Sequence, residues 1–259
     1  MIEIKNVVMR FGGLTAIDHI SFSIPPGRIT GLIGPNGAGK TTLFNVIAGN
    51  LSPSRGTVYL DGEDITPLAP HERFARGLLR TFQIAQEFST LTVLENLLMV
   101  APGQPGERLM DAWFRPSKVA AHEAEIRTRA FEVLDFLRLT ELAQEPAGNL
   151  SGGQKKLLEL GRTLMTEAKV VLLDEIGAGV NRTLLGELGD RIIELNQTRG
   201  TTFCLIEHDL EFVTRLCDPV IVMAEGALLA QGTADQVLTD EAVVEAYLGS
   251  TDPGQAEAS

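Results

Sequence analysis

A glycine-rich loop between an apolar run and a helical pattern constrains the fold of this chain more than any other feature. Residues 28–33 are predicted to form a short strand, and residues 40–48 a helix that Gly49 ends as its C-cap. The loop fits the pattern G-x-x-x-x-G-K-[ST] and consists of Gly34, Pro35, Asn36, Gly37, Ala38, Gly39, Lys40 and Thr41, followed by Thr42. Because strand, loop and helix in this order begin a parallel α/β unit, we predict the α/β fold class.

The loop has the residue types that are needed to hold several phosphate charges. Glycines let backbone N–H groups converge on phosphate oxygens, and the N-terminus of the following helix adds partial positive charge. Lys40 is predicted to reach the outer phosphates, and the Thr41 hydroxyl is a predicted Mg²⁺ ligand. The whole loop, with Thr42, is therefore a predicted nucleotide-binding segment. The alternative is an accidental glycine turn.

Two carboxylates follow a second apolar strand, which is predicted over residues 170–173. A third apolar run, 202–206, is separated from it by an amphipathic helical stretch over 184–195, an alternation that predicts parallel buried strands. Asp174 and Glu175 would then lie at the carboxyl edge of the sheet, beside the phosphate loop. Asp174 is suited to hold Mg²⁺ and Glu175 to orient an attacking water. For this pair taken alone, a solvated strand end is the alternative.

The remainder of the chain divides into an antiparallel start and a helical insertion. Alternating apolar residues and Gly- or Pro-rich turns near the N-terminus predict a short antiparallel meander. Residues from about 85 to 160 are predicted to be mostly helical, because one helical face collects Ile126, Ala130, Val133, Leu134 and Leu137. Within this stretch a loop around Trp113 is predicted from Pro102, Gly103, Pro105, Gly106 and Pro116. The tail, 250–259, is small and polar, and we expect it to be disordered.

Composition excludes several classes of function. The chain has 22 Lys and Arg against 34 Asp and Glu, a net charge of −12, which argues against a general nucleic-acid surface. It has no apolar run of about 18 residues, and its N-terminus lacks the pattern of a secretory signal, so we expect a cytosolic chain that does not span a bilayer. Cys204 and Cys217 form no CxxC pair, which favours buried thiols over a disulfide or zinc site.

A third sequence motif indicates which kind of nucleotide-hydrolysing protein this chain resembles. Leu150-Ser151-Gly152-Gly153-Gln154 precedes a helical run over 155–165 and then the strand that ends at Asp174 and Glu175. In this order the chain resembles the ATPase subunit of an ABC transporter. The resemblance implies ATP and Mg²⁺ as cofactors and ATP hydrolysis as the activity.

The resemblance also implies a domain organisation. One ABC ATPase domain would cover residues 1–249, with a P-loop (RecA-like) core over 1–84 and 161–249. An N-terminal antiparallel β subdomain would belong to this core. A helical subdomain, about 85–160, would be inserted into it.

Several residues acquire roles through this resemblance alone. Phe11 matches the aromatic that stacks on adenine, with a core aromatic as the alternative. Gln83 matches the glutamine that senses Mg²⁺ and the γ-phosphate, so it is a predicted catalytic residue and metal ligand, with a surface glutamine as the alternative. His208 matches the switch histidine at the γ-phosphate, with a structural histidine at a strand end as the alternative.

The resemblance further implies that two subunits share each nucleotide. Hydrogen-bond donors to the γ-phosphate at the site of the second subunit would come from Ser151, Gly152, Gly153 and Gln154. Two ATP molecules would then lie between two subunits arranged head to tail. Closure of this dimer would therefore require an intact γ-phosphate. Gly179-Val180-Asn181 matches the family's D-loop at this interface.

One departure from the family is visible directly after Glu175. Ile176 stands where the family usually has proline. Proline would fix φ at about −65°, so Ile176 leaves this backbone freer. We expect hydrolysis to survive the difference.

The details resemble one subgroup, the larger ATPase of branched-chain amino acid importers. The shared strings are Phe11-Gly12-Gly13-Leu14-Thr15-Ala16, Arg80-Thr81-Phe82-Gln83, Leu91-Thr92-Val93-Leu94-Glu95-Asn96, Ile206-Glu207-His208-Asp209 and Glu245-Ala246-Tyr247-Leu248-Gly249. The loop around Trp113 also fits, whereas the smaller companion ATPase and the lipopolysaccharide-exporting relative usually lack it. Urea and amide importers share these strings and stay open as alternatives, as does lipopolysaccharide export.

The subgroup implies partners and a location. Transmembrane permease subunits and a second ABC ATPase, identical or different, would be direct partners, and an external solute-binding protein an indirect one. The chain would lie peripherally on the cytoplasmic face of the cell membrane and bind no nucleic acid. Two other classes compete with this interpretation. A nucleic-acid-acting ABC ATPase generally carries coiled-coil or zinc insertions or two cassettes, and a small-molecule kinase would leave the LSGGQ string unexplained.

Overall fold

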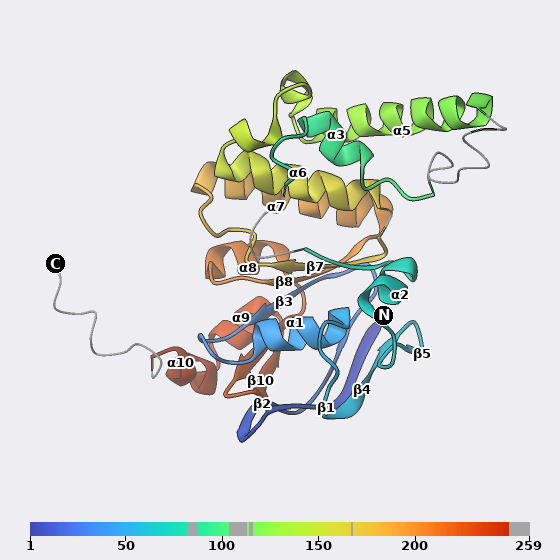
Figure 1. Ribbon diagram of the computed structural model, residues 1–259. Coiled ribbons are helices and arrows are strands. Elements are labelled where there is room, and N and C mark those ends of the chain that lie inside the picture. Colours follow the sequence, from blue (N-terminus) through green and yellow to red (C-terminus); the bar gives the residue numbers. More distant parts are fainter. Residues whose placement is uncertain (82–86, 104–112, 114–115, 167, 249–259) are drawn as a thin grey trace. The chain divides into compact units, whose positions relative to one another are not determined.

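The computed structural model describes residues 1–81, 87–103, 113, 116–166 and 168–248. Gln83 and the predicted disordered tail, 250–259, lie outside the described residues. The chain divides into two compact units (Figure 1). The first unit takes its residues from 1–83, 169–178 and 192–259, and the second from 84–168 and 179–191.

The first unit begins with an antiparallel sheet in the strand order β2-β1-β4-β5. Its strands are β1 (Ile2–Phe11), β2 (Leu14–Ile24), β4 (Arg55–Leu60) and β5 (Glu63–Asp64). The tight turn between β1 and β2 places Gly12 at a φ of 59°, which glycine adopts without steric cost. The predicted antiparallel start is confirmed.

A second sheet in this unit has the order β10-β9-β3-β8-β7-β6. Its strands are β3 (Ile29–Ile33), β6 (Leu78–Arg80), β7 (Val170–Asp174), β8 (Thr202–Ile206), β9 (Val220–Ala224) and β10 (Ala227–Gly232). All neighbours are parallel except β9 and β10. Every residue of β3, β7 and β8 is buried, as continuous apolar runs predict. The three predicted parallel strands are therefore confirmed, with β7 extending to include Asp174.

Helix α1 (Lys40–Ala48) lies between these two sheets (Figure 1). Its buried side chains, among them Leu43, Phe44 and Ile47, belong to one apolar cluster with residues of both sheets. Gly49 ends the helix at a φ of 85°, as its predicted role as C-cap requires. The sheets thus hold α1, and with it the loop that precedes α1, from two sides.

A buried arginine holds the carboxyl end of α1. Arg73, on α2 (Pro70–Ala75), is 1% exposed. Its guanidinium donates to the carbonyl oxygens of Val46 and Ile47, both at 2.7 Å, and also to those of Thr66 and Leu68. The bonds to Val46 and Ile47 supply a donor to carbonyl groups in the last turn of α1, where a helix lacks its regular intrahelical donors.

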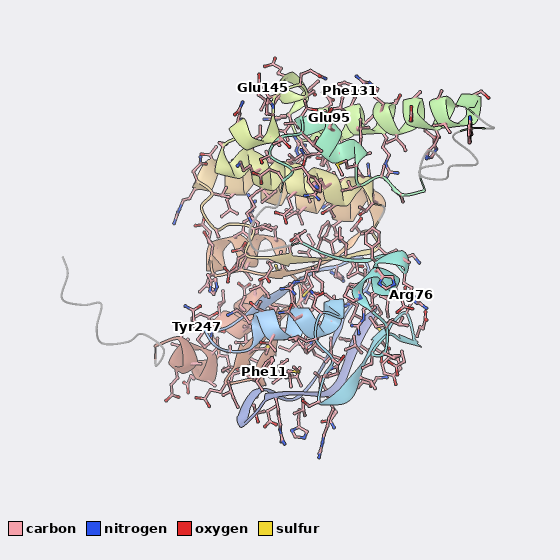
Figure 2. The ribbon with its side chains drawn as sticks, in the orientation of Figure 1. Phe11, Arg76, Glu95, Phe131, Glu145 and Tyr247 are labelled. Carbon is pink, nitrogen blue, oxygen red and sulfur yellow. The ribbon has the colours of Figure 1, made fainter. Side chains whose placement is uncertain are left out.

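The second unit is helical. It contains α3 (Val93–Leu98), α5 (Pro116–Phe136) and α6 (Gly152–Met165), with the first part of α7 (Arg182–Arg199). The predicted apolar face is buried: Ile126, Ala130, Val133 and Leu134 lie on α5, and Leu137 follows directly after the helix. Thr92 begins α3 through a capping box with Glu95, whose side chain is labelled in Figure 2. Pro116, predicted to mark a loop, is instead the first residue of α5, a position where proline is favoured.

The first unit also contains three short helices that follow its later strands: α8 (Leu210–Leu216), α9 (Ala234–Leu238) and α10 (Glu241–Leu248). None of the helices in the described part of the chain is both long and apolar enough to cross a membrane. Cys204 and Cys217 are free and buried, as predicted, and burial raises the pKa of the Cys217 thiol to about 12.

We predict that Arg73→Met lowers the free energy of unfolding by at least about 3 kcal/mol. The substitution removes the donor to four carbonyl oxygens, and an unsatisfied buried group costs roughly 1–3 kcal/mol. Chemical denaturation measures the difference. Arg76→Met is the matched control, because Arg76 (Figure 2) makes an exposed ion pair with Glu63 and should cost about 1 kcal/mol or less. Equal losses in the two variants would contradict the role given to Arg73.

Candidate functional site

The path of the loop between β3 and α1 requires glycine at two positions. Gly34 has a φ of 145°, and a Cβ there would lie 2.0 Å from the carbonyl oxygen of Met223. Gly39, the residue before α1, has a φ of 92°, and its Cβ would lie 2.5 Å from the carbonyl oxygen of Ala16. The backbones of β9 and β2 therefore approach Gly34 and Gly39 so closely that neither position has room for a Cβ. Gly37, at a φ of 80°, faces open space instead.

Lys40 begins α1 and is almost fully buried. Its Nζ donates to the carbonyl oxygens of Gly34 at 2.7 Å and Pro35 at 2.9 Å. Burial lowers the pKa of Lys40, and the nearby carboxylates of Glu175 and Asp174 oppose that shift. The first turn of α1 contains no acidic residue, so the partial positive charge of its N-terminus is not offset there. An anion would meet both this charge and the ammonium group.

A cleft of about 580 Å³ lies over the loop, within the range that small-molecule and cofactor sites occupy. It is lined by Phe11, Leu14, Thr15, Ala16, Asn36, Gly37, Ala38, Gly39, Lys40, Thr41, Thr42, Glu175, Glu225 and Gly226. Phe11 comes from the end of β1 (Figure 2) and is 46% exposed. A core aromatic, the alternative for Phe11, is therefore excluded.

Part of this lining was not singled out by sequence reasoning. Glu225 and Gly226 form the tight turn between β9 and β10, and Gly226 accepts a backbone hydrogen bond from Asp18 at 2.8 Å. Two apolar runs joined by two residues that include glycine are a hairpin signal. That signal predicts the turn, but its place over the phosphate loop depends on pairing with a strand about 200 residues away, which no local pattern encodes.

Asp174 ends β7 and is fully buried. Its Oδ2 accepts a hydrogen bond from Arg80 at 2.7 Å, and the other terminal nitrogen of Arg80 donates to Asn45 Oδ1 at 2.5 Å. Asn45 in turn donates to the Thr41 carbonyl oxygen on α1. The second oxygen of the carboxylate, Oδ1, has no hydrogen-bond partner among the described residues. A buried carboxylate oxygen without a donor is suited to receive a cation or its water.

Glu175 and His208 are in direct contact. Glu175 Oε1 lies 3.0 Å from His208 Nε2. Glu175 has a φ of 51°, an uncommon conformation for a residue with a side chain, and its N–H donates to the Ile206 carbonyl oxygen at 3.0 Å. The side chain of Ile176 is buried directly after it. The turn after β7 thus directs Glu175 into the cleft beside His208.

The LSGGQ string belongs to the second unit. Ser151 caps α6: its Oγ accepts from the Gln154 N–H at 3.3 Å, and its own N–H donates to Gln154 Oε1 at 2.9 Å. Gly152 and Gly153 form the first turn of this helix, and a Cβ on Gly153 would lie 1.7 Å from Leu184 Cδ2. Leu184 lies on α7, at whose start Asn181 Oδ1 accepts from the Leu184 N–H. The string therefore forms the N-terminus of α6, which does not exclude a further role.

The glycine loop at a helix N-terminus, with a cleft over it and carboxylates at the end of the parallel strand β7, defines a P-loop nucleotidase. The family model described as ABC transporter matches residues 17–178. The chain therefore belongs to the family of ABC transporter ATPases. A second model, described as branched-chain amino acid ATP-binding cassette transporter, matches residues 227–253.

Relatives of known classification match along the whole chain. The probable branched-chain amino acid transport ATP-binding protein LivG of Archaeoglobus fulgidus is 41% identical over 97% of this chain and 96% of its own. The high-affinity branched-chain amino acid transport ATP-binding protein LivG of Escherichia coli strain K12 is 37% identical over 96% of this chain and 98% of its own. A solved ATP-binding cassette of an ABC transporter in its ADP conformation is 39% identical, with a TM-score of 0.81, over 96% of this chain and 98% of the other.

We predict that Gly34→Ala destabilises the fold more than Gly37→Ala does. Both substitutions introduce a left-handed strain of about 1–2 kcal/mol, but only the Gly34 methyl group would collide with a backbone oxygen. Urea denaturation compares the two variants, and ADP titration reports whether the loop keeps its shape. Equal unfolding midpoints for the two variants would show that close contact with the backbone of β9 does not restrict the residue at position 34.

Proposed function

We propose that this chain is the ATP-binding and ATP-hydrolysing subunit of an importer for branched-chain or closely related amino acids. The observation that carries the proposal is the full-length similarity to branched-chain amino acid transport ATP-binding proteins, together with a cleft in which the phosphate loop and Glu175 face each other. Nucleotide-driven closure of two such subunits would supply the force for transport.

The nucleotide is proposed to lie in the cleft over the phosphate loop. Phe11 offers an exposed ring at its rim for the adenine, since base–aromatic stacking is typically worth about 1–3 kcal/mol. The amides of the loop and the N-terminus of α1 would hold the phosphates. Lys40 would exchange its bonds to two carbonyl oxygens for phosphate oxygens, which carry more negative charge.

The residues present fit a magnesium ion. Asp174 Oδ1 is buried without a partner among the described residues, and the Thr41 hydroxyl lines the cleft, so these two groups would hold it, with Gln83 as a proposed third. When bound, Mg²⁺ would neutralise charge on the transferred phosphoryl group. Arg80 leaves Asp174 Oδ1 available because it bonds only to Oδ2.

Glu175 is proposed to orient the attacking water, with His208 beside it. The 3.0 Å contact between the two side chains fixes the direction in which the carboxylate can accept a proton. Ser151, Gly152, Gly153 and Gln154 are proposed to complete the nucleotide site of a second cassette, which makes hydrolysis dependent on dimer formation. Membrane-spanning permease subunits and an external solute-binding protein would complete the assembly, with this chain on the cytoplasmic face of the membrane.

Glu175→Gln should abolish most turnover without loss of ATP binding. The substitution keeps the shape of the side chain and leaves the phosphate loop unchanged, whereas general-base assistance is typically worth about 10²–10⁴-fold. Phosphate release measures turnover, equilibrium titration measures binding, and light scattering should detect an ATP-dependent dimer of the variant. Lys40→Ala is the contrasting variant, which should lose binding itself. Near-normal hydrolysis by Glu175→Gln would remove Glu175 from the mechanism.

Deletion of the gene should reduce uptake of labelled leucine, isoleucine or valine, and a Lys40→Ala copy should not restore it. The wild-type copy is the control, because it supplies the same chain with an intact phosphate loop. Leucine uptake could instead stay unchanged while uptake of urea or an amide, or lipopolysaccharide export, falls. That result would leave the assignment as an ATPase in place and overturn the assignment of the substrate.

A further inference from the structure

A buried carboxylate beside the proposed catalytic pair has no part in the chemistry described above. Glu207 lies between β8 and His208, and only 4% of it is exposed. Its Oε1 accepts a hydrogen bond from the Gly177 N–H at 2.7 Å, and its Oε2 accepts a longer one from the His208 N–H at 3.3 Å. Gly177 is two residues beyond Glu175, so one carboxylate holds backbone on both sides of the Glu175–His208 contact.

The turn that Glu207 holds is conformationally demanding. Glu175 adopts a φ of 51°, and a residue in such a region persists only where its surroundings determine it. Two backbone bonds contribute: the Glu175 N–H donates to Ile206, and the Ala178 N–H donates to the Glu175 carbonyl oxygen at 3.2 Å. Neither bond fixes the Gly177 amide. The bond to Glu207 does, and it is strong because its acceptor is a carboxylate.

The position of Glu207 is unfavourable for its own charge. Burial raises the pKa of Glu207, and the amides of Gly177 and His208 offset part of that rise. An apolar side chain of similar size would avoid the cost of desolvation. The carboxylate therefore supplies something that an apolar residue cannot, which is an acceptor for the amide of the turn.

We propose that Glu207 is a positioning residue for ATP hydrolysis, which fixes the 175–178 turn through the Gly177 amide and thereby fixes the Glu175 carboxylate against His208. The inference rests on the proposed function, because Glu207 acts through Glu175. Glu207 does not line the cleft, so it affects the hydrolytic step and not the binding of nucleotide.

Glu207→Met and Glu207→Gln separate this role from a general contribution to the fold. Methionine has a similar volume but no comparable acceptor, and glutamine keeps a carbonyl oxygen that accepts from Gly177. We expect kcat to fall about tenfold or more in Glu207→Met, because the turn that carries Glu175 loses the charged acceptor of its Gly177 amide. The affinity for Mg²⁺-free ADP should stay unchanged, and Glu207→Gln should recover most of the turnover. Glu211→Ala, which removes an exposed carboxylate from α8, is the control for loss of one negative charge.

Hydrogen exchange provides a direct readout of the contact. The Gly177 amide should exchange faster in Glu207→Met than in the wild type, and Glu207→Gln should retain its protection. Thermal melting of both variants establishes that they are folded. Wild-type turnover in a folded Glu207→Met, or unchanged exchange at Gly177, would overturn the proposal.

A double-mutant cycle with Glu175→Gln distinguishes failure of this inference from failure of the proposed function. If Glu207 acts through Glu175, Glu207→Met should cause no further loss of hydrolysis in the Glu175→Gln background. The same fold loss in both backgrounds would mean that Glu207 acts independently, and the inference would be wrong. Normal hydrolysis by Glu175→Gln itself would instead overturn the mechanism on which the inference rests.

Discussion

The site depends on close approach of backbone to backbone around the phosphate loop. Gly34 passes under the carbonyl oxygen of Met223, and Gly39 under that of Ala16, at distances that exclude a Cβ. One contact comes from the parallel sheet and the other from the antiparallel sheet. The loop is therefore shaped by both sheets at once, and α1, packed between them, carries the same constraint to its N-terminus. A chain that lacked either sheet could not hold these amides in place.

Charge around the loop is arranged locally, against the acidic balance of the whole chain. The net charge of the chain is −12. Lys40 and the N-terminus of α1 nevertheless line the cleft, and the first turn of α1 contains no acidic residue. Of the carboxylates that approach the loop, Asp174 is paired with Arg80 and Glu175 with His208, while Glu225 also lines the cleft. The affinity of the cleft for an anion therefore depends on the hydrogen-bond donors and charges that line it, because solvent and salt screen the charges of the more distant acidic surface.

Three polar side chains in the first unit hold particular pieces of backbone or a particular carboxylate. Arg73 satisfies the carbonyl groups at the end of α1, Arg80 connects β6 to Asp174 and Asn45, and Glu207 holds the turn after Glu175. Burying such groups costs desolvation energy, and this cost is offset only where the fold places a partner within hydrogen-bonding distance. Rigidity around the cleft therefore comes from these few bonds as well as from apolar packing.

Elements whose signals are local can be predicted from the residues alone. The glycine loop with its flanking strand and helix, the buried strands that precede Asp174 and His208 and the apolar face of α5 all follow from spacing and residue type. Contacts between residues far apart in the sequence become visible only in the folded chain. Arg80 bonds to an acidic residue 94 positions away, Glu225 and Gly226 join the cleft from the far end of the chain, and Glu207 reaches back 30 positions to Gly177. Local patterns set the conformation of a segment, but the pairing of strands far apart in the sequence depends on how all segments bury their apolar surface together, and only the folded chain expresses that condition.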